Sequence, residues 1–292
     1  MREIVQAFRE DLKIALDMAD NTVKTYCGAA DKFLDALNDR DFNAPSYDDF
    51  KAWKASLNNM AQSSKALQLS GVRAFYKFLI RTGRIKDNPF PMDFVVRVKH
   101  QEPKTIPTVS QFLTLRRAAI SLGSSERLAL ELLAGSGLRV NALLSLKPKH
   151  LRLGTDRPAI LVDADDMSCK GKVADEIPIS PYAAELLRRE IEDRSIKLDD
   201  NIFYVSDVTV RSWLAKVDRA SGLNLGLVPH GLRHFFCCMT YWRDFDGGHH
   251  NAVWVQKAAG HASLETTTIY LDRALRIGVT EALWNEWAKG AA

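Results

Sequence analysis

The sequence predicts a mainly helical protein of two domains, with a small antiparallel sheet in the second domain. Apolar residues recur at helical spacing through most of the chain. The 292 residues are too many for one typical small domain and suit two. Four prolines within residues 87–108 interrupt the helical pattern. We therefore expect a helical domain at 1–88, a linker at 89–108 and a second domain at 109–292.

The first domain is predicted to be helical, and its helices open at capping or turn-forming residues. These openings are Asn21-Thr22, Pro45-Ser46 and Ser63-Ser64. Apolar residues then follow at helical spacing, which predicts one buried face per helix. On the last of these helices, the predicted apolar face consists of Leu67, Val72, Phe75, Tyr76 and Leu79.

Basic residues are concentrated at the end of the first domain. Residues 1–49 contain six Lys/Arg and eleven Asp/Glu, whereas residues 50–105 contain eleven and three. Side chains four or eight positions apart line up on one side of the helix that opens at 63–64, namely Lys65, Arg73, Lys77 and Arg81. Such a row suits a run of phosphates, and these four residues are candidate nucleic-acid ligands. The alternative is a solvated helix face.

The second domain changes its pattern once. Residues 160–162 and 176–179 have the apolar composition of strands and enclose a polar segment, which predicts a small antiparallel hairpin. Helical patterns surround it. The predicted helices are 109–121, 125–135, 139–147, 181–192, 207–220, 230–243, 251–259 and 263–269, and an apolar segment follows at 278–289.

Composition argues against a membrane or secreted protein. No run of about 18 apolar residues is present, and Met1 to Glu10 lack the apolar core of a signal peptide. The four cysteines, Cys27, Cys169, Cys237 and Cys238, form no CxxC pair. We expect reduced thiols and a cytoplasmic protein, and we do not favour a catalytic cysteine.

Three segments of the second half carry residues suited to phosphate chemistry. They are Gly135-Ser136-Gly137-Leu138-Arg139, His230-Gly231-Leu232-Arg233-His234, and Gly260-His261 with Tyr270 nine residues later. Their order and spacing resemble the tyrosine recombinase family, also called the phage integrase family. The likeness extends to the segments 71–79 and 87–89 and so covers about residues 10–285.

The resemblance implies how the site would cleave DNA. A phosphodiester gains negative charge in its transition state, and Arg139 and Arg233 can each present a planar fork of donors to the charged oxygens. Tyr270 would be the nucleophile and would form a covalent phosphotyrosine. Its phenol has a pKa near 10 in water, so it needs a proton acceptor at neutral pH.

The remaining roles are also implied by the resemblance. His230 would assist the tyrosine, and His261 would bind the scissile phosphate. A hairpin lysine would donate a proton to the departing 5′ oxygen. Lys170 is the better match to that lysine, with Lys172 as the second choice and otherwise a DNA contact.

A metal site at these histidines is the alternative for this segment. His230 and His234 lie one helical turn apart and could chelate an ion, with a third ligand from His249-His250. We do not favour it, because no Glu follows His230 as a metalloprotease helix would require. The resemblance implies no metal and no nucleotide cofactor.

Two features depart from the family pattern. The family usually has an acidic residue three positions after the first arginine, where this chain has Ala142. That acid would buttress the arginine, so its loss puts the rate in doubt rather than the reaction. Residues 241–250 also make the segment between Arg233 and His261 longer than expected, and Gly247-Gly248 suggest a surface loop.

The implied function is site-specific DNA recombination or integration, for a phage, a mobile element or the chromosome. Two domains would form a C-shaped clamp on double-stranded DNA in the nucleoid. Four protomers would exchange strands through a Holliday junction, with accessory DNA-bending proteins as further partners. The apolar segment 278–289 would dock on a neighbouring protomer, or alternatively on its own domain. A type IB topoisomerase-like activity and a catalytically decayed DNA-binding accessory factor are the rival functions.

Overall fold

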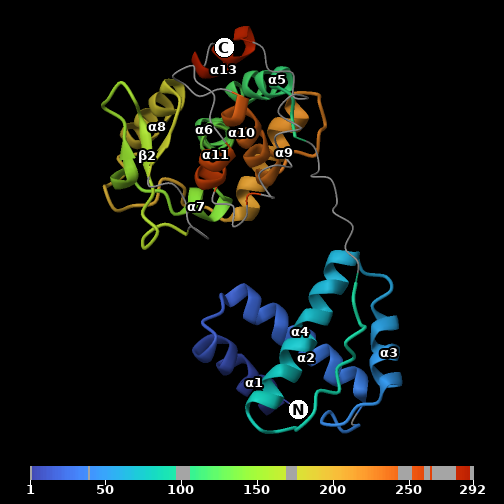
Figure 1. Ribbon diagram of the computed structural model, residues 1–292. Helices are drawn as coiled ribbons and strands as arrows, with labels where there is room; N and C mark the ends of the chain where they lie inside the picture. Colours follow the sequence, from blue (N-terminus) through green and yellow to red (C-terminus); the bar gives the residue numbers. More distant parts are fainter. Residues whose placement is uncertain are drawn as a thin grey trace. The chain divides into compact units, whose positions relative to one another are not determined.

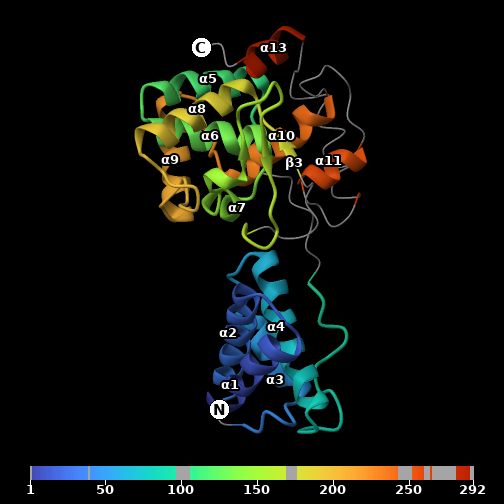
Figure 2. The same cartoon turned by 90° about the vertical axis from the view of Figure 1, so that its left-hand side faces the viewer.

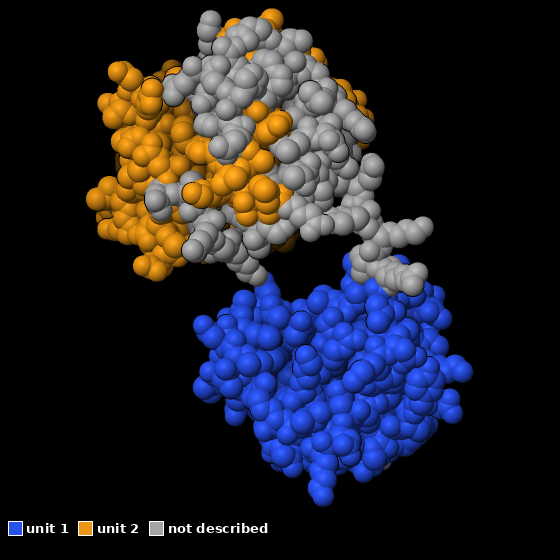
Figure 3. Space-filling view, in the orientation of Figure 1, with its two compact units in different colours: residues 1–102 blue, residues 103–292 orange. Residues whose placement is uncertain are grey.

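The computed structural model describes residues 2–38, 40–96, 106–168, 176–242, 252–259, 264 and 281–289. The chain forms two compact units, residues 1–102 and 103–292 (Figure 3). Both are mainly helical, and the second contains a three-stranded antiparallel sheet, so the predicted fold class is confirmed. No helix within the described ranges is both long and apolar enough to cross a membrane.

The first unit is a group of helices around an aromatic core (Figure 1). Phe33 stacks on Phe50 with ring centroids 5.0 Å apart, and Phe8, Phe75 and Tyr76 are also fully buried. Helix α2 packs along α4 and also contacts α1 and α3. The elements are α1 Arg2–Glu10, a π-helical turn Asp11–Ala15, α2 Asp20–Leu37, α3 Tyr47–Ser56 and α4 Gln62–Arg81.

Local sequence explains how these helices begin and meet. Ser46 caps α3, because its hydroxyl accepts a bond from the Asp49 amide at 3.2 Å and its own amide donates to the Asp49 carboxylate at 2.9 Å. The Ser46 hydroxyl also donates to the Asp49 carboxylate at 2.7 Å, and this bond, together with that of the Ser46 amide, holds the pKa of Asp49 below its usual value. At the α2–α4 contact, a β-carbon on Gly71 would lie 2.7 Å from that of Ala29, so glycine permits the close approach.

Three expectations for this unit need correction. Helix α2 begins at Asp20 and α4 at Gln62, so the N-cap residues are Ala19 and Ala61, and the helices do not open at Asn21-Thr22 and Ser63-Ser64. Leu67, predicted on the apolar face of α4, is 45% exposed. The predicted linker begins too early, since Phe90 and Phe94 are buried in the core of the first unit.

The second unit surrounds a central helix, α10 (Figures 1 and 2). Helix α10 packs against α6 and α11, while α9 packs against α5, α6 and α7. The helices are α5 Val109–Ile120, α6 Ser124–Ser136, α7 Val140–Leu144, a 3₁₀ turn Pro148–His150, α8 Pro181–Asp193, α9 Asp207–Ala220, α10 Pro229–Trp242, α11 Ala252–Ala259 and α13 Glu281–Lys289. Helix α7 is shorter than the predicted 139–147, and the helix predicted at 263–269 lies outside the described residues apart from Leu264.

The sheet contains one strand more than predicted. Strands β2 Ala159–Leu161 and β3 Glu176–Pro178 are the expected antiparallel pair. The additional strand, β1 Leu151–Arg152, pairs antiparallel with β2 to give the order β1-β2-β3. Ile160 on β2 is fully buried, so the sheet contributes to the core of the unit.

The three described cysteines, Cys27, Cys237 and Cys238, are buried free thiols, as the sequence predicted. Burial raises the pKa of Cys237 to about 12. A thiol that does not ionise is a poor nucleophile, so Cys237 packs as a small apolar residue. Cys169 lies outside the described residues.

A buried ion pair anchors the C-terminal helix. Arg116 on α5 is 1% exposed and binds both carboxylate oxygens of Glu131, at 2.6 and 2.8 Å. The same guanidinium donates to the main-chain carbonyls of Glu286 and Trp287 at 3.3 and 3.0 Å. Cations are favourable at a helix C-terminus, and here the cation binds the last turn of α13. Helix α13 therefore packs on α5 and α8 of its own chain, the alternative that the sequence left open.

Replacing Arg116 by Ala is expected to destabilise the protein by about 3–5 kcal/mol, because Glu131 would remain buried without its counter-charge. The free energy of unfolding in denaturant measures this loss. Arg117→Ala is the matched control on the same helix, since that side chain is 60% exposed and pairs with Glu286. It should cost less than about 1 kcal/mol. Equal losses in the two variants would contradict a special role for the buried pair.

Candidate active site

The site is built on the sharp turn that ends α6. Gly137 follows the helix with φ of +63°, a left-handed conformation that glycine adopts without strain. A β-carbon at Gly137 would overlap the ring of Phe236 on α10, so the two elements meet too closely for any larger residue. The turn leads at once to Arg139, which is the N-cap residue of α7.

Arg233 ties α10 to the same turn. Its guanidinium donates a hydrogen bond to the main-chain carbonyl of Gly137, and the residue is only 4% exposed. Phe235 and Phe236, the residues that follow on α10, are buried in the core. Phe236 was not predicted, although its position three residues after Arg233 places it on a neighbouring part of the helix surface.

Arg139 and His230 complete the described part of the site. Arg139 is half-buried, and its carbonyl accepts the Leu143 amide at 2.9 Å within α7. Burial lowers the pKa of His230, and the positive charges of Arg233 and Arg139 lower it further. The structure thus brings together three of the predicted catalytic residues. The lowered pKa favours the neutral form of His230, which is the form that can accept a proton.

The paired histidines do not by themselves make a metal site. The rings of His230 and His234 meet edge to face, with centroids 4.0 Å apart, and His234 is buried. Their suggested third ligands, His249 and His250, lie outside the described residues. In the part of the chain that the structure describes, the His/Cys/Asp/Glu side chains that approach one another closely enough are His150, Asp163 and Asp166, elsewhere in the unit. There the ammonium groups of Lys147 and Lys149 already bind Asp166.

The other predicted catalytic residues, Lys170, His261 and Tyr270, lie outside the described residues, as does Lys172. In the sequence, both lysines belong to the connection between β2 and β3. Of the predicted surface loop at 241–250, Tyr241 and Trp242 belong to α10, and residues 243–250 are outside the described ranges.

Position 142, where the family usually has an acidic residue, is occupied by a buried alanine. Ala142 is buried in α7, and its carbonyl accepts a hydrogen bond from the Ser145 hydroxyl at 3.1 Å. A carboxylate here would be desolvated among apolar neighbours, at a considerable cost in free energy. The backbone geometry at Gly137 and the cap of α7 therefore place Arg139.

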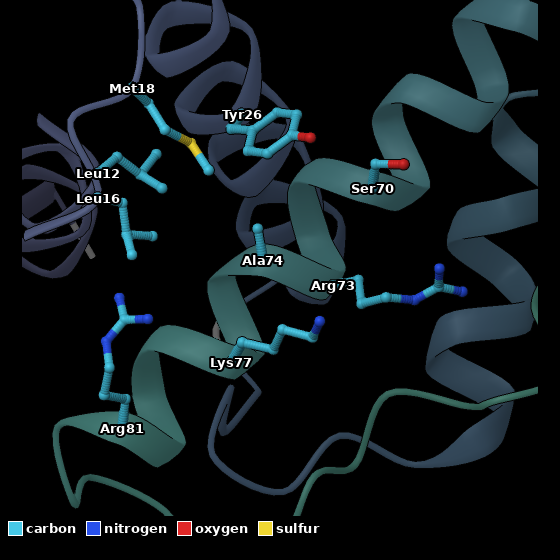
Figure 4. A pocket seen from close by; sticks show the side chains of 9 residues that line it. All are labelled: Leu12, Leu16, Met18, Tyr26, Ser70, Arg73, Ala74, Lys77 and Arg81. Carbon is cyan, nitrogen blue, oxygen red and sulfur yellow. The ribbon is translucent and has the colours of Figure 1, made fainter. Parts of the chain in front are cut away.

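The four basic residues predicted to bind DNA have different surroundings on α4. Arg73 donates to the Phe94 carbonyl at 3.1 Å, Lys65 donates to the Asn58 side chain at 3.3 Å, and Arg81 pairs with Asp11. A pocket of about 350 Å³ beside the helix has one cationic and one apolar side (Figure 4). The Lys77 side chain lies between those of Arg73 and Arg81 in this pocket, and Lys77 is exposed. The pocket is lined by Leu12, Leu16, Met18, Tyr26, Ser70, Arg73, Ala74, Lys77 and Arg81.

Two arginines beside a histidine are a combination suited to binding an ester of phosphoric acid. The sequence model of the phage integrase family matches residues 107–275, and that of the phage integrase N-terminal SAM-like domain matches residues 5–83. The chain therefore belongs to the phage integrase family, the tyrosine recombinases, as its motifs predicted.

Individual relatives cover nearly the whole chain. A tyrosine recombinase XerC of Bacillus pumilus (strain SAFR-032) is 29% identical over 294 residues, which covers 92% of this chain and 91% of that protein. Among solved structures, XerH bound to palindromic difH after cleavage gives a TM-score of 0.70 at 17% identity, covering 93% and 82% of the two chains. A lambda integrase dimer bound to a COC' core site gives 0.68 at 18%, covering 92% and 94%. The structural matches show that the fold is shared.

Gly137→Ala is expected to destabilise the protein by about 2–4 kcal/mol, because it adds left-handed strain and an overlap with Phe236. Gly135→Ala is the matched control two residues earlier. Gly135 is helical and has open space where a β-carbon would stand, so alanine should stabilise the protein by about 0.5–1 kcal/mol. Chemical denaturation measures both changes, and a neutral Gly137→Ala would refute the close approach of α6 and α10.

Proposed function

We propose that this protein is a site-specific DNA recombinase that cuts and rejoins strands through a 3′-phosphotyrosine on Tyr270. The observation that carries the proposal is the convergence of Arg139, His230 and Arg233 on one site in a chain of this family. Arg233 is largely withdrawn from water, and a charge in such a place interacts strongly with negative charge as it develops on a phosphate.

The proposed reaction conserves the phosphodiester bond energy. The Tyr270 oxygen attacks phosphorus while the bond to the 5′ oxygen breaks. His230 takes the phenolic proton, and Lys170 donates a proton to the departing oxygen, with Lys172 as the alternative donor. Arg139 and Arg233 bind the non-bridging oxygens, and His261 binds the scissile phosphate. The freed 5′ hydroxyl of another strand reverses these steps, so no nucleotide cofactor is consumed.

Recombination is favoured over its rivals by the extent of the likeness. Relatives that align over nine-tenths of both lengths are recombinases, which argues against a type IB topoisomerase-like role. The gathered site residues argue against a decayed accessory factor. Relaxation of a plasmid that lacks target sites would reveal topoisomerase activity.

The assembly that we propose is a C-shaped clamp of the two units on duplex DNA and a tetramer on two duplexes, with DNA-bending proteins as further partners. Helix α13 has the features of an exchangeable element. Trp284 and Trp287 form its buried apolar face. Arg116 binds the helix through the main-chain carbonyls of residues 286 and 287, so that contact does not depend on a particular side chain. The same surface of α5 and α8 on a neighbouring copy would bind α13 equally well. A head-to-tail exchange of α13 between copies would close into a ring.

The Tyr270→Phe variant tests the chemistry directly. Wild-type protein incubated with nicked duplexes that tile the DNA flanking its gene should leave a covalent protein–DNA band on a denaturing gel. Phenylalanine lacks the attacking oxygen, so the variant should leave none. Covalent species in the variant would refute Tyr270 as nucleophile. Salt-sensitive DNA binding without a covalent band from any duplex would instead support the accessory-factor alternative.

Lys77→Gln is expected to weaken DNA binding and to reduce the slope of log K against log salt by about 1, because one phosphate contact is lost. Fluorescence anisotropy of a labelled mixed-sequence duplex at several salt concentrations measures the slope. Lys32→Gln is the control, because Lys32 is an exposed lysine between Asp31 and Asp35. Equal slopes for wild type and Lys77→Gln would exclude Lys77 from the DNA interface.

A further inference from the structure

A buried carboxylate on α9 holds the loop that leads into the catalytic helix. Asp218 is 4% exposed, and its two oxygens accept three consecutive main-chain amides. The Leu225 amide donates at 2.9 Å, the Gly226 amide at 2.8 Å and the Leu227 amide at 3.2 Å. A carboxylate that accepts several amides is a strong, directional anchor, since each bond is assisted by its charge.

The loop of residues 225–227, which Asp218 holds, leads directly into the first turn of α10. Gly226 adopts φ of +70°, which turns its own amide and that of Leu227 toward the same carboxylate oxygen. The next residue, Val228, accepts the amides of Gly231 and Leu232 at 3.0 and 3.3 Å. His230 lies within this turn, and Arg233 follows it.

Helix α9 also connects to the other arginine. It packs against α7, whose N-cap residue is Arg139, and against α5 and α6. Asp218 thus lies on a helix that contacts the Arg139 side of the site, and it anchors the entry to the His230 and Arg233 side. Neither the core packing nor the family motifs assign a task to this carboxylate.

We propose that Asp218 is a positioning residue, which fixes the first turn of α10 against α7 and so sets His230 and Arg233 relative to Arg139. This inference rests on the proposed function only for its catalytic consequence. The positional consequence can be observed without DNA. Among the described residues, the charged groups that face His230 are Arg233 on its own helix and Arg139 at the start of α7, with the His234 ring beside it.

The test uses the full chain and the variant Asp218→Asn, which keeps the size of the side chain but loses its charge and one acceptor. NMR titration of ring-labelled histidines, assigned with His230→Gln, gives the pKa of His230. We expect that pKa to rise toward the ordinary value of about 6.5, as the ring becomes less buried and moves away from the two arginines. Covalent adduct formation on the nicked duplexes should slow by about ten- to hundredfold, while DNA affinity stays the same.

The pH profile provides a third measurement. His230 acts as a base only when neutral, so a higher pKa moves the acidic limb of the cleavage rate to higher pH. Asp207→Asn is the matched control, because Asp207 is an exposed carboxylate on the same helix, 3.5 Å from Arg211. It should leave the His230 titration, the adduct rate and the pH profile as in the wild type.

Gly226→Ala serves if Asp218→Asn does not fold. It keeps the carboxylate, has open space for the new β-carbon, and strains the loop through its positive φ alone. The same changes in pKa and rate are expected. An unchanged His230 titration together with a wild-type adduct rate, in either variant, would overturn the positioning role. A wild-type protein that forms no adduct would refute the proposed function instead, and the titration would still decide the role of Asp218.

Discussion

The catalytic unit depends on the burial of the Arg233 guanidinium beneath the turn at Gly137. A charge withdrawn from water is costly unless hydrogen bonds hold it, and here the glycine carbonyl accepts one. That bond requires α6 to stop where it does, and the stop requires a residue with a left-handed backbone and no β-carbon beside Phe236. The position of Arg139, two residues later, follows from the same turn. One constraint therefore places both arginines.

Other buried charges in the second unit are held by partners of equally fixed geometry. Arg116 binds Glu131 and the carbonyls of α13, and Asp218 binds three amides before α10. Such groups are stable only in one arrangement of the helices, so they specify geometry more than they add free energy. The first unit differs, because its core is apolar and rich in aromatic residues, and its arginines on α4 are held by Asp11 and the Phe94 carbonyl. An ion pair at the surface, such as that of Arg81 with Asp11, costs little to break.

Sequence patterns predicted several features that are encoded within a few residues, and missed features that depend on residues distant in the sequence. The Ser46 cap and the β2–β3 pair were predicted correctly, because each is encoded by a short stretch of sequence. Strand β1 has two residues, too few for any periodicity. The prolines of 89–108 suggested a linker, yet Phe90 finds its partners on helices far away in the sequence. In the sequence, Asp218 is an ordinary polar residue of an amphipathic helix. Its role depends on the main-chain amides of residues 225–227, which sequence patterns do not place.

The packing around Arg139 also explains how the site can lack an acid at position 142. A second-shell carboxylate orients an arginine by pairing with it, which matters most when the arginine's backbone is free to shift. Here the backbone of Arg139 is fixed on one side by the glycine turn and on the other by the Leu143 amide that closes the first turn of α7. Ala142 instead packs into the core that α7 shares with α9, the helix that carries Asp218. The glycine turn, the first-turn hydrogen bond and apolar contact together hold the backbone that an ion pair would otherwise orient, so Arg139 can keep its place without the acid.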